Sequence, residues 1–217
     1  MKAETSVLIH LLHSAAAATL ATQSAQMPGY PHASILPFAP DAHHCPILLV
    51  SRLAEHTRNL QADSRASLLV TPPGSHNVLE EPRLTLIGDA TPLDASPTLL
   101  ARYLRYQPDA RRYLELGDFS FFRLQPKRAR YIGGFARMGW IDQAQWGEAA
   151  VLDPAAEQAC CDELAATLPA HIRLLGLDCY GADLEQGGRR QRQPFPNAPI
   201  AAPDLRATAA QVLALLT

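Results

Sequence analysis

Two short apolar runs stand close together in the first third of the chain, at Ile47 to Val50 and at Ala66 to Val70. Continuous apolar runs of this length with polar flanks are typical of buried β-strands. The segment between them is mostly polar, with Leu53 and Leu60 spaced so that both could pack inward from a short helix. The pattern therefore predicts two buried strands joined by a helix.

Further strands and helices are predicted around this segment, up to about Trp146. Alternating apolar and polar positions indicate strands, and apolar positions at helical spacing indicate helices. So many strands at short spacing favour a small antiparallel barrel over an alternation of strands and helices. On the first helix, His10 and His13 flank the apolar stripe and are expected at the surface. The predicted strands are 19–23, 32–38, 83–90, 119–124 and 128–132, and the predicted helices are 5–18 and 97–116, the latter broken at Pro108.

The composition changes at residues 147–154, and a second unit is predicted beyond them. Pro154 suits the first turn of a helix that continues to Leu168. A strand over 172–178 and a second over 189–195 are separated by turns at 180–183 and 187–188. An amphipathic helix over 204–216 closes the chain. The C-terminal part, residues 147–217, is thus expected to be a small αββα domain.

Composition excludes several classes of function. The chain has 217 residues and a formal net charge of −2, which gives no reason to expect a nucleic-acid partner. No uncharged apolar run is long enough to cross a bilayer. The four cysteines show no CxxC spacing and the N-terminus lacks signal-peptide features, so a cytoplasmic protein is expected.

The polar segment between the two apolar runs is the best candidate for chemistry. Ser51, Arg52, His56, Thr57 and Asn59 bring hydroxyls, a guanidinium, an imidazole and an amide to the probable start of a helix. Helix N-termini and arginine both favour an anion, and hydroxyls complete its hydrogen bonding, so the set suits a phosphate group. The alternative is a solvated helix that only connects two strands.

One cluster resembles a metal site in composition. His43, His44 and Cys45 follow Asp41 within a predicted loop. Adjacent histidines on a loop point in different directions, however, and no second ligand pair stands at a matching spacing elsewhere. No metal site is therefore predicted.

The run from Leu48 to Val70, LLVSRLAEHTRNLQADSRASLLV, resembles the FMN-binding split-barrel family related to pyridoxamine 5′-phosphate oxidase. Residues 83–88, 118–124 and Gly133-Gly134-Phe135 add to this likeness, which is greatest to the HugZ-type haem-utilisation branch. Residues 177–184 resemble a C-terminal domain of unknown function that is often fused to this branch. The fold class implied is α+β, with an antiparallel split β-barrel over residues 1–146.

The resemblance implies a homodimeric flavoprotein, with FMN at the dimer interface and a small-molecule substrate. Flavin carries the electrons in such proteins, and the polypeptide positions it. The sequence has no counterpart of the Arg- and His-containing substrate segment of pyridoxamine phosphate oxidase, so the main prediction is a flavin-dependent oxidoreductase acting on another substrate. The implied FMN ligands are Ser34, Ser51, Arg52, His56, Thr57, Asn59 and Arg83.

Two alternatives remain open. The HugZ-type branch binds and degrades haem through a histidine in the C-terminal part, where this chain has only His171. The sequence also departs from the glycine-rich pattern of that branch at Gly134-Phe135-Ala136. The second alternative is a barrel without a cofactor that serves for binding or dimerisation.

Overall fold

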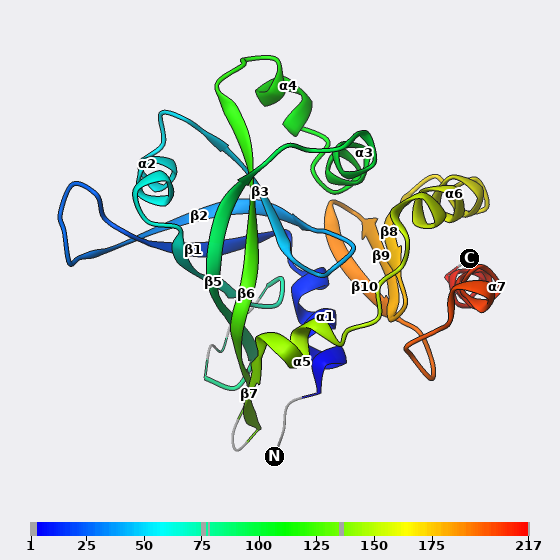
Figure 1. The fold of residues 1–217 in the computed structure, drawn as a ribbon. Coiled ribbons are helices and arrows are strands. Elements are labelled where there is room, and N and C mark those ends of the chain that lie inside the picture. Colours follow the sequence, from blue (N-terminus) through cyan, green and yellow to red (C-terminus); the bar gives the residue numbers. More distant parts are fainter. Residues whose placement is uncertain (1–3, 75–76, 78, 135–136, 217) are drawn as a thin grey trace.

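Six antiparallel strands close into a barrel in the computed structural model, which describes residues 4–74, 77, 79–134 and 137–216 (Figure 1). The strand order is β3-β2-β1-β4-β5-β6, and pairing of β3 with β6 closes the ring. β7 extends the sheet beyond β6. This confirms the predicted fold class. The strands are β1 (Ala17–Gln23), β2 (Pro31–Pro40), β3 (Pro46–Ser51), β4 (Arg65–Val70), β5 (Pro82–Leu93), β6 (Phe119–Gly133) and β7 (Met138–Asp142).

The barrel core follows from the alternation of side chains along each strand. Leu20, Leu68, Leu84 and Leu86 point inward from three strands and are fully buried. β3 is apolar on both faces. One face points into the barrel, and the other is covered by the helices α3 (Pro97–Tyr106) and α4 (Ala110–Leu114). A continuous apolar run is what a strand buried on both faces requires.

β6 is one long strand where two were predicted, at 119–124 and 128–132. Its partner β5 shifts register between Ile87 and Gly88, which accommodates Pro126 opposite. A Cβ at Gly88 would lie 2.0 Å from the Gln125 carbonyl oxygen, so this close approach requires glycine. β7 was not predicted as a strand, and Phe135 and Ala136 lie outside the described residues.

The C-terminal unit, meaning residues 154–216, packs two helices on the face of a three-stranded sheet that points away from the barrel (Figure 1). The order β10-β9-β8 makes it αβββα rather than αββα. Of the predicted turn at residues 180–183, Tyr180 does lie in a turn, but residues 181–183 are the start of β9, which pairs with both neighbours. Glycine and aspartate at that point signal a turn locally, and the pairing overrides them. The elements are α6 (Pro154–Ala165), β8 (Ile172–Asp178), β9 (Gly181–Gln186), β10 (Arg189–Pro194) and α7 (Ala202–Ala214), and α5 (Gln143–Gly147) precedes them.

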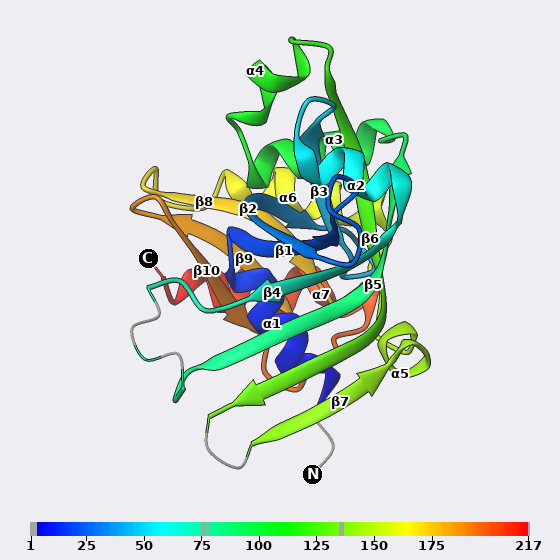
Figure 2. The same cartoon turned by 90° about the vertical axis from the view of Figure 1, so that its left-hand side faces the viewer.

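Helix α2 (Glu55–Ala62) lies against β1 and β2 near one end of the barrel and is attached by buried polar contacts (Figure 2). Asn59 is fully buried; its amide donates to the Thr22 hydroxyl at 3.0 Å and accepts from the Ala25 N–H at 2.9 Å. The buried Thr57 hydroxyl donates to the Ser51 carbonyl at 2.6 Å. These bonds fix the helix to the strand before it and to β1.

Helix α1 (Thr5–Ser14) lies between the barrel and the C-terminal sheet (Figure 1). His13 on this helix is fully buried, so the expectation of a surface histidine was wrong. Its Nδ1 lies 2.7 Å from Asp183 Oδ2 and 3.3 Å from Asp178 Oδ2. Arg192 donates to both carboxylates, at 2.7 Å each. We call His13, Asp178, Asp183 and Arg192 the buried quartet.

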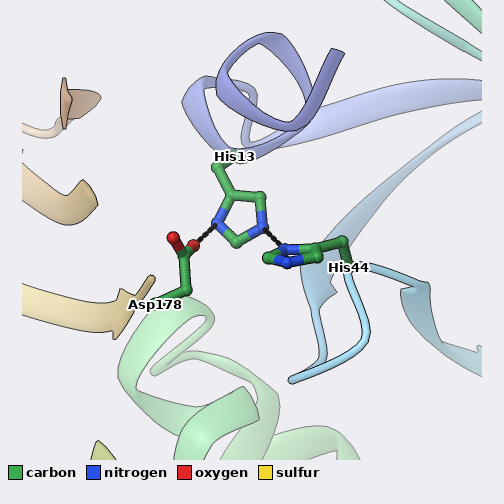
Figure 3. A group of neighbouring side chains, drawn as sticks. All are labelled: His13, His44 and Asp178. Atoms are coloured by element: carbon green, nitrogen blue, oxygen red, sulfur yellow. Dashed lines mark hydrogen bonds and ion pairs between the residues drawn. The ribbon is translucent and has the colours of Figure 1, made fainter. Parts of the chain in front are cut away.

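Hydrogen-bond directions assign the charge of His13 (Figure 3). His44 Nε2 lies 3.2 Å from the Ala150 carbonyl and must donate to it, so the Nδ1 of a neutral His44 accepts. His13 Nε2, 3.0 Å away, is then the donor, and His13 Nδ1 donates to carboxylate. His13 therefore carries both protons, and the buried quartet holds two positive and two negative charges.

The surroundings agree with this assignment. Burial opposes ionisation of Asp178 and Asp183, but Arg192 and His13 outweigh it and hold both pKa values below the usual range. Burial lowers the pKa of His44 to about 3, which keeps that ring neutral. None of the helices in the described part of the chain has the length and apolar character needed to cross a bilayer.

Replacing Asn59 with Ala is expected to lower the free energy of unfolding by about 1–3 kcal/mol, because the buried Thr22 hydroxyl and Ala25 N–H each lose a partner. Urea unfolding followed by circular dichroism measures the loss. The exposed Arg58→Ala substitution, on the same helix, serves as the control and should change stability by less than about 0.5 kcal/mol. Equal effects of the two substitutions would contradict the assigned role of Asn59.

Stability should also fall as the pH drops from 7 to 4.5, and His44 should account for part of this. The unfolded chain takes up a proton near pH 6.5, while folded His44 resists protonation down to about pH 3. More protons bound by the unfolded state means lower stability at lower pH, here by about 2 kcal/mol over this range.

His44→Asn isolates this effect, because asparagine does not titrate and tolerates the φ of 59° at this position. Urea unfolding at both pH values should show a shallower pH dependence for this variant than for the wild type. His171→Asn, at an exposed histidine, should keep the wild-type dependence. A wild-type dependence in His44→Asn would show that His44 is protonated at pH 4.5 in the folded protein.

Candidate functional site

The predicted phosphate-binding segment forms the end of β3 and the start of α2. The Ser51 hydroxyl donates to Asp118 Oδ2 at 2.6 Å and accepts from the Leu53 N–H at 3.1 Å. The backbone N–H of Arg52 donates to the Asp118 carbonyl at 2.8 Å. Ser51 therefore holds the strand-to-helix turn against the segment that leads into β6.

Two of the other predicted ligands face into the protein. The Thr57 and Asn59 side chains are fully buried and make the hydrogen bonds that anchor α2. Their hydroxyl and amide groups are thus occupied within the chain. The sequence predicted phosphate binding by these residues because hydroxyl and amide groups that can hold an anion can equally fix a helix to its neighbours.

A group of partly exposed polar side chains lies on the remaining side of α2. Ser34 on β2 lies 3.2 Å from His56 Nδ1 through its hydroxyl, so the structure brings these two predicted residues together. Burial, and then the neighbouring His32, lower the pKa of His56 and favour the neutral ring. With Nδ1 held by Ser34, the remaining ring nitrogen, Nε2, has no hydrogen-bond partner in the described part of the chain.

His32 also belongs to this group, although it was not among the ligands predicted from the sequence. It precedes Ser34 by two residues on β2 and so shares its face. Its Nε2 lies 3.8 Å from Glu55 Oε2, and its buried Nδ1 has no hydrogen-bond partner among the residues described. The alternation of side chains along a strand was the signal that could have paired His32 with Ser34.

The rim of this group is cationic and apolar. Arg52 and Arg58 are exposed, and neither side chain forms an ion pair within the described ranges. Leu53, in the turn before the helix, is 77% exposed, which is high for an aliphatic side chain. An imidazole, two guanidinium groups and apolar surface are thus available together beside α2.

The last two predicted residues lie elsewhere in the chain. Arg83 is near the start of β5, where Leu84 pairs with Val70 at the end of β4, whereas α2 leads into the start of β4. A single chain therefore does not bring Arg83 to the α2 group. His171 is exposed in the turn before β8, within the C-terminal unit.

The structure also answers the question raised by the adjacent histidines. His44 turns inward to His13, while His43 is exposed, so the two do point in different directions. His13, His44 and Asp178 could place ligand atoms within 4.8 Å of one another (Figure 3). Each ring nitrogen already has a hydrogen-bond or ion-pair partner, and Arg192 lies on the carboxylate. The cluster is therefore neutralised without a metal ion.

Comparison with known proteins gives relatives that bind or degrade haem. The chain is 39% identical to the chloroplastic heme oxygenase HOZ of Arabidopsis thaliana over 147 residues, which is 64% of this chain and 44% of that protein. The chain thus matches less than half the length of this relative. A heme binding protein from Mycobacterium smegmatis has 26% identity and a TM-score of 0.62, covering 99% of this chain and 98% of the other.

A second similar structure supports the fold over nearly the whole chain. A protein of unknown function from Agrobacterium tumefaciens has a TM-score of 0.75 and 24% identity, covering 97% of this chain and 94% of the other. Residues 3–148 match the family model described as "CREG, beta-barrel". This match spans the whole barrel, from α1 to the end of α5. The chain therefore belongs to the CREG β-barrel family.

Proposed function

We propose that this protein binds haem beside α2, with His56 as the axial ligand, and takes part in oxidative haem breakdown. The observation that carries the proposal is the neutral imidazole of His56, held through Nδ1 by Ser34 and with no hydrogen-bond partner at Nε2. Iron in haem is bound by a neutral imidazole nitrogen, and a hydrogen bond at the other nitrogen orients the ring. When bound, haem would supply the redox-active iron.

The surrounding residues suit the rest of a haem molecule. Arg52 and Arg58 are exposed guanidinium groups that could pair with the two propionates. Leu53 offers apolar surface for the macrocycle. Relatives described as a heme oxygenase and a heme binding protein support the same reading and give it a reaction class.

FMN remains the second candidate, in a flavin-dependent oxidoreductase acting on a small molecule. Arg52 beside the N-terminus of α2 favours it, because both would attract the FMN phosphate. The polar groups of Thr57 and Asn59, however, form hydrogen bonds inside the protein, so fewer hydroxyl and amide groups remain for a ribityl chain. Two relatives are described as a heme oxygenase and a heme binding protein, so we rank FMN below haem as the proposed cofactor.

We further propose that two copies associate through the outer face of the barrel. Ile35, Thr19, Leu69 and Thr85 form one row across β2, β1, β4 and β5 in the sheet register. This row has no charged residue, and Ile35 and Leu69 are 77% and 38% exposed. Uncharged surface with exposed aliphatic side chains is typical of an interaction face, and a symmetric dimer is the commonest way to cover it.

Haem titration of the purified protein tests the main proposal. The wild type should give a saturable Soret band, and His56→Ala should weaken haem binding about tenfold or more because the axial ligand is lost. Ser34→Ala should have a smaller effect on the band position or the affinity than His56→Ala, because the His56 imidazole keeps its iron-binding nitrogen and loses only the hydrogen bond that orients it. His171→Ala is the control for the other candidate ligand.

Three outcomes separate the readings. A Soret band that vanishes in His171→Ala and persists in His56→Ala would move the haem site to the C-terminal unit. Tight FMN binding without a haem spectrum, reduced in Arg52→Ala, would favour the flavoprotein. Neither spectrum in the wild-type protein would contradict both cofactor proposals and leave the binding or dimerisation module.

A further inference from the structure

Two adjoining cavities lie where the barrel meets the segment that leads into the C-terminal unit. The smaller, of about 160 Å³, includes His43, Arg123, Gln125 and Trp146 in its lining. The larger, of about 220 Å³, shares His43 and Arg123 with it. Arg123 on β6 pairs with Ile47 near the start of β3. Ser51, beside α2, is at the other end of β3 and pairs with Phe119. The cavities are thus separate from the α2 group.

The smaller cavity contains more hydrogen-bond donors than the protein satisfies. Trp146 is 3% exposed, and its buried Nε1–H has no acceptor in the described part of the chain. An indole N–H usually has a partner when buried, so this donor indicates an acceptor that the protein itself does not provide. Gln125 accepts from the Cys45 thiol through Oε1 at 3.6 Å, which leaves its NH₂ group as a further donor.

Arg123 adds the one positive charge in the lining of this cavity. Its Nε lies 2.7 Å from Asp41 Oδ2 but makes no aligned hydrogen bond, and the guanidinium also contacts the Cys45 thiol. A guanidinium has five N–H donors, so several are left for a ligand. Asp41 is less able to compete for them, because its Oδ1 accepts from the backbone N–H groups of His43 and Cys45 at 2.8 Å each.

The larger cavity is apolar where it adjoins this group. Ala42, Leu93, Leu99 and Pro154 are in its lining. Its other guanidinium, Arg102, is fully engaged: it donates to the Pro40 carbonyl at 2.7 Å and to the Tyr106 hydroxyl at 3.2 Å, and pairs with buried Glu157. Near the shared wall, the Arg123 guanidinium and the Asp41 carboxylate therefore face each other, and Arg123 carries the positive charge that is not fully engaged.

We propose that the two cavities form a binding site for a small monocarboxylate with an apolar body. The carboxylate would lie in the smaller cavity and accept hydrogen bonds from Arg123, Trp146 and Gln125, and the apolar body would occupy the larger one. The Arg123 guanidinium has N–H donors beyond the Nε that faces Asp41, and a planar carboxylate suits paired N–H donors. Buried sites with few polar groups and an apolar wall are typical of small-molecule sites.

Trp146 itself reports on the site. The chain has two tryptophans, and the other, Trp140, lies on β7 under Arg128 at 4.1 Å. In a Trp140→Phe background, emission therefore comes from Trp146 alone. Titration with butyrate, hexanoate and octanoate should give a saturable change in emission that tightens with chain length, whereas hexanol should give none at the same concentration.

Arg123→Gln in this background should weaken hexanoate binding about tenfold or more, and Arg123→Lys should restore part of it. Arg128→Gln removes a matched positive charge outside the cavities and should leave binding unchanged. Circular dichroism establishes that each variant is folded. In the wild-type background, Trp146→Phe should weaken binding in calorimetry, because the side chain stays aromatic but the indole N–H is lost.

Four results would overturn the proposal. They are no saturable change at about 1 mM hexanoate, equal binding of hexanol, undiminished binding in folded Arg123→Gln, and binding of inorganic phosphate as tight as that of octanoate. The first would mean that the Trp146 donor is satisfied by buried water alone, which can serve such groups. The last would mean a general anion site without use of the apolar cavity.

Discussion

The buried quartet is the interaction on which the arrangement of the two parts depends. His13 comes from the first helix, and Asp178, Asp183 and Arg192 come from the C-terminal sheet, so the contact joins sequence positions 170 residues apart. Isolated buried charges are costly, and these four are tolerated because they balance and share hydrogen bonds. The balanced charges and shared hydrogen bonds give the cluster a clear role in joining the first helix to the C-terminal sheet.

The end of the barrel at α2 divides its polar side chains between two tasks. Thr57, Asn59 and Ser51 bond to the protein and hold the helix in place, whereas His56, Arg52 and Arg58 keep groups that solvent or a ligand can reach. The committed groups make the turn rigid, and rigidity is what a binding residue such as His56 needs from its support. The proposed haem site therefore rests on the residues that the phosphate prediction had assigned to the ligand.

Much of this fold could be predicted from sequence, because the barrel strands follow local patterns. The apolar run at Ile47 to Val50 predicted a buried strand correctly, and alternation predicted β5. The run at Ala66 to Val70 also forms a strand, β4, but one that is buried on one face only. The burial of His13 could not be foreseen, since its partners are distant in sequence. The site was predicted in part: Ser34 and His56 do meet, but only the folded backbone shows that Asn59 points inward and that Arg83 lies elsewhere.

The position of α1 has a consequence for the order in which the chain folds during synthesis. A barrel that forms as it leaves the ribosome would present α1 with His13 lacking its carboxylate partners until β8 and β9 emerge. Contacts of such high sequence separation form late, because the intervening loop must close first. Leu8, Leu11 and Leu12 can pack on the barrel as soon as it forms, whereas the side of α1 that carries Ile9 is covered only by the C-terminal unit. Until then that side is open to chaperones and to neighbouring chains.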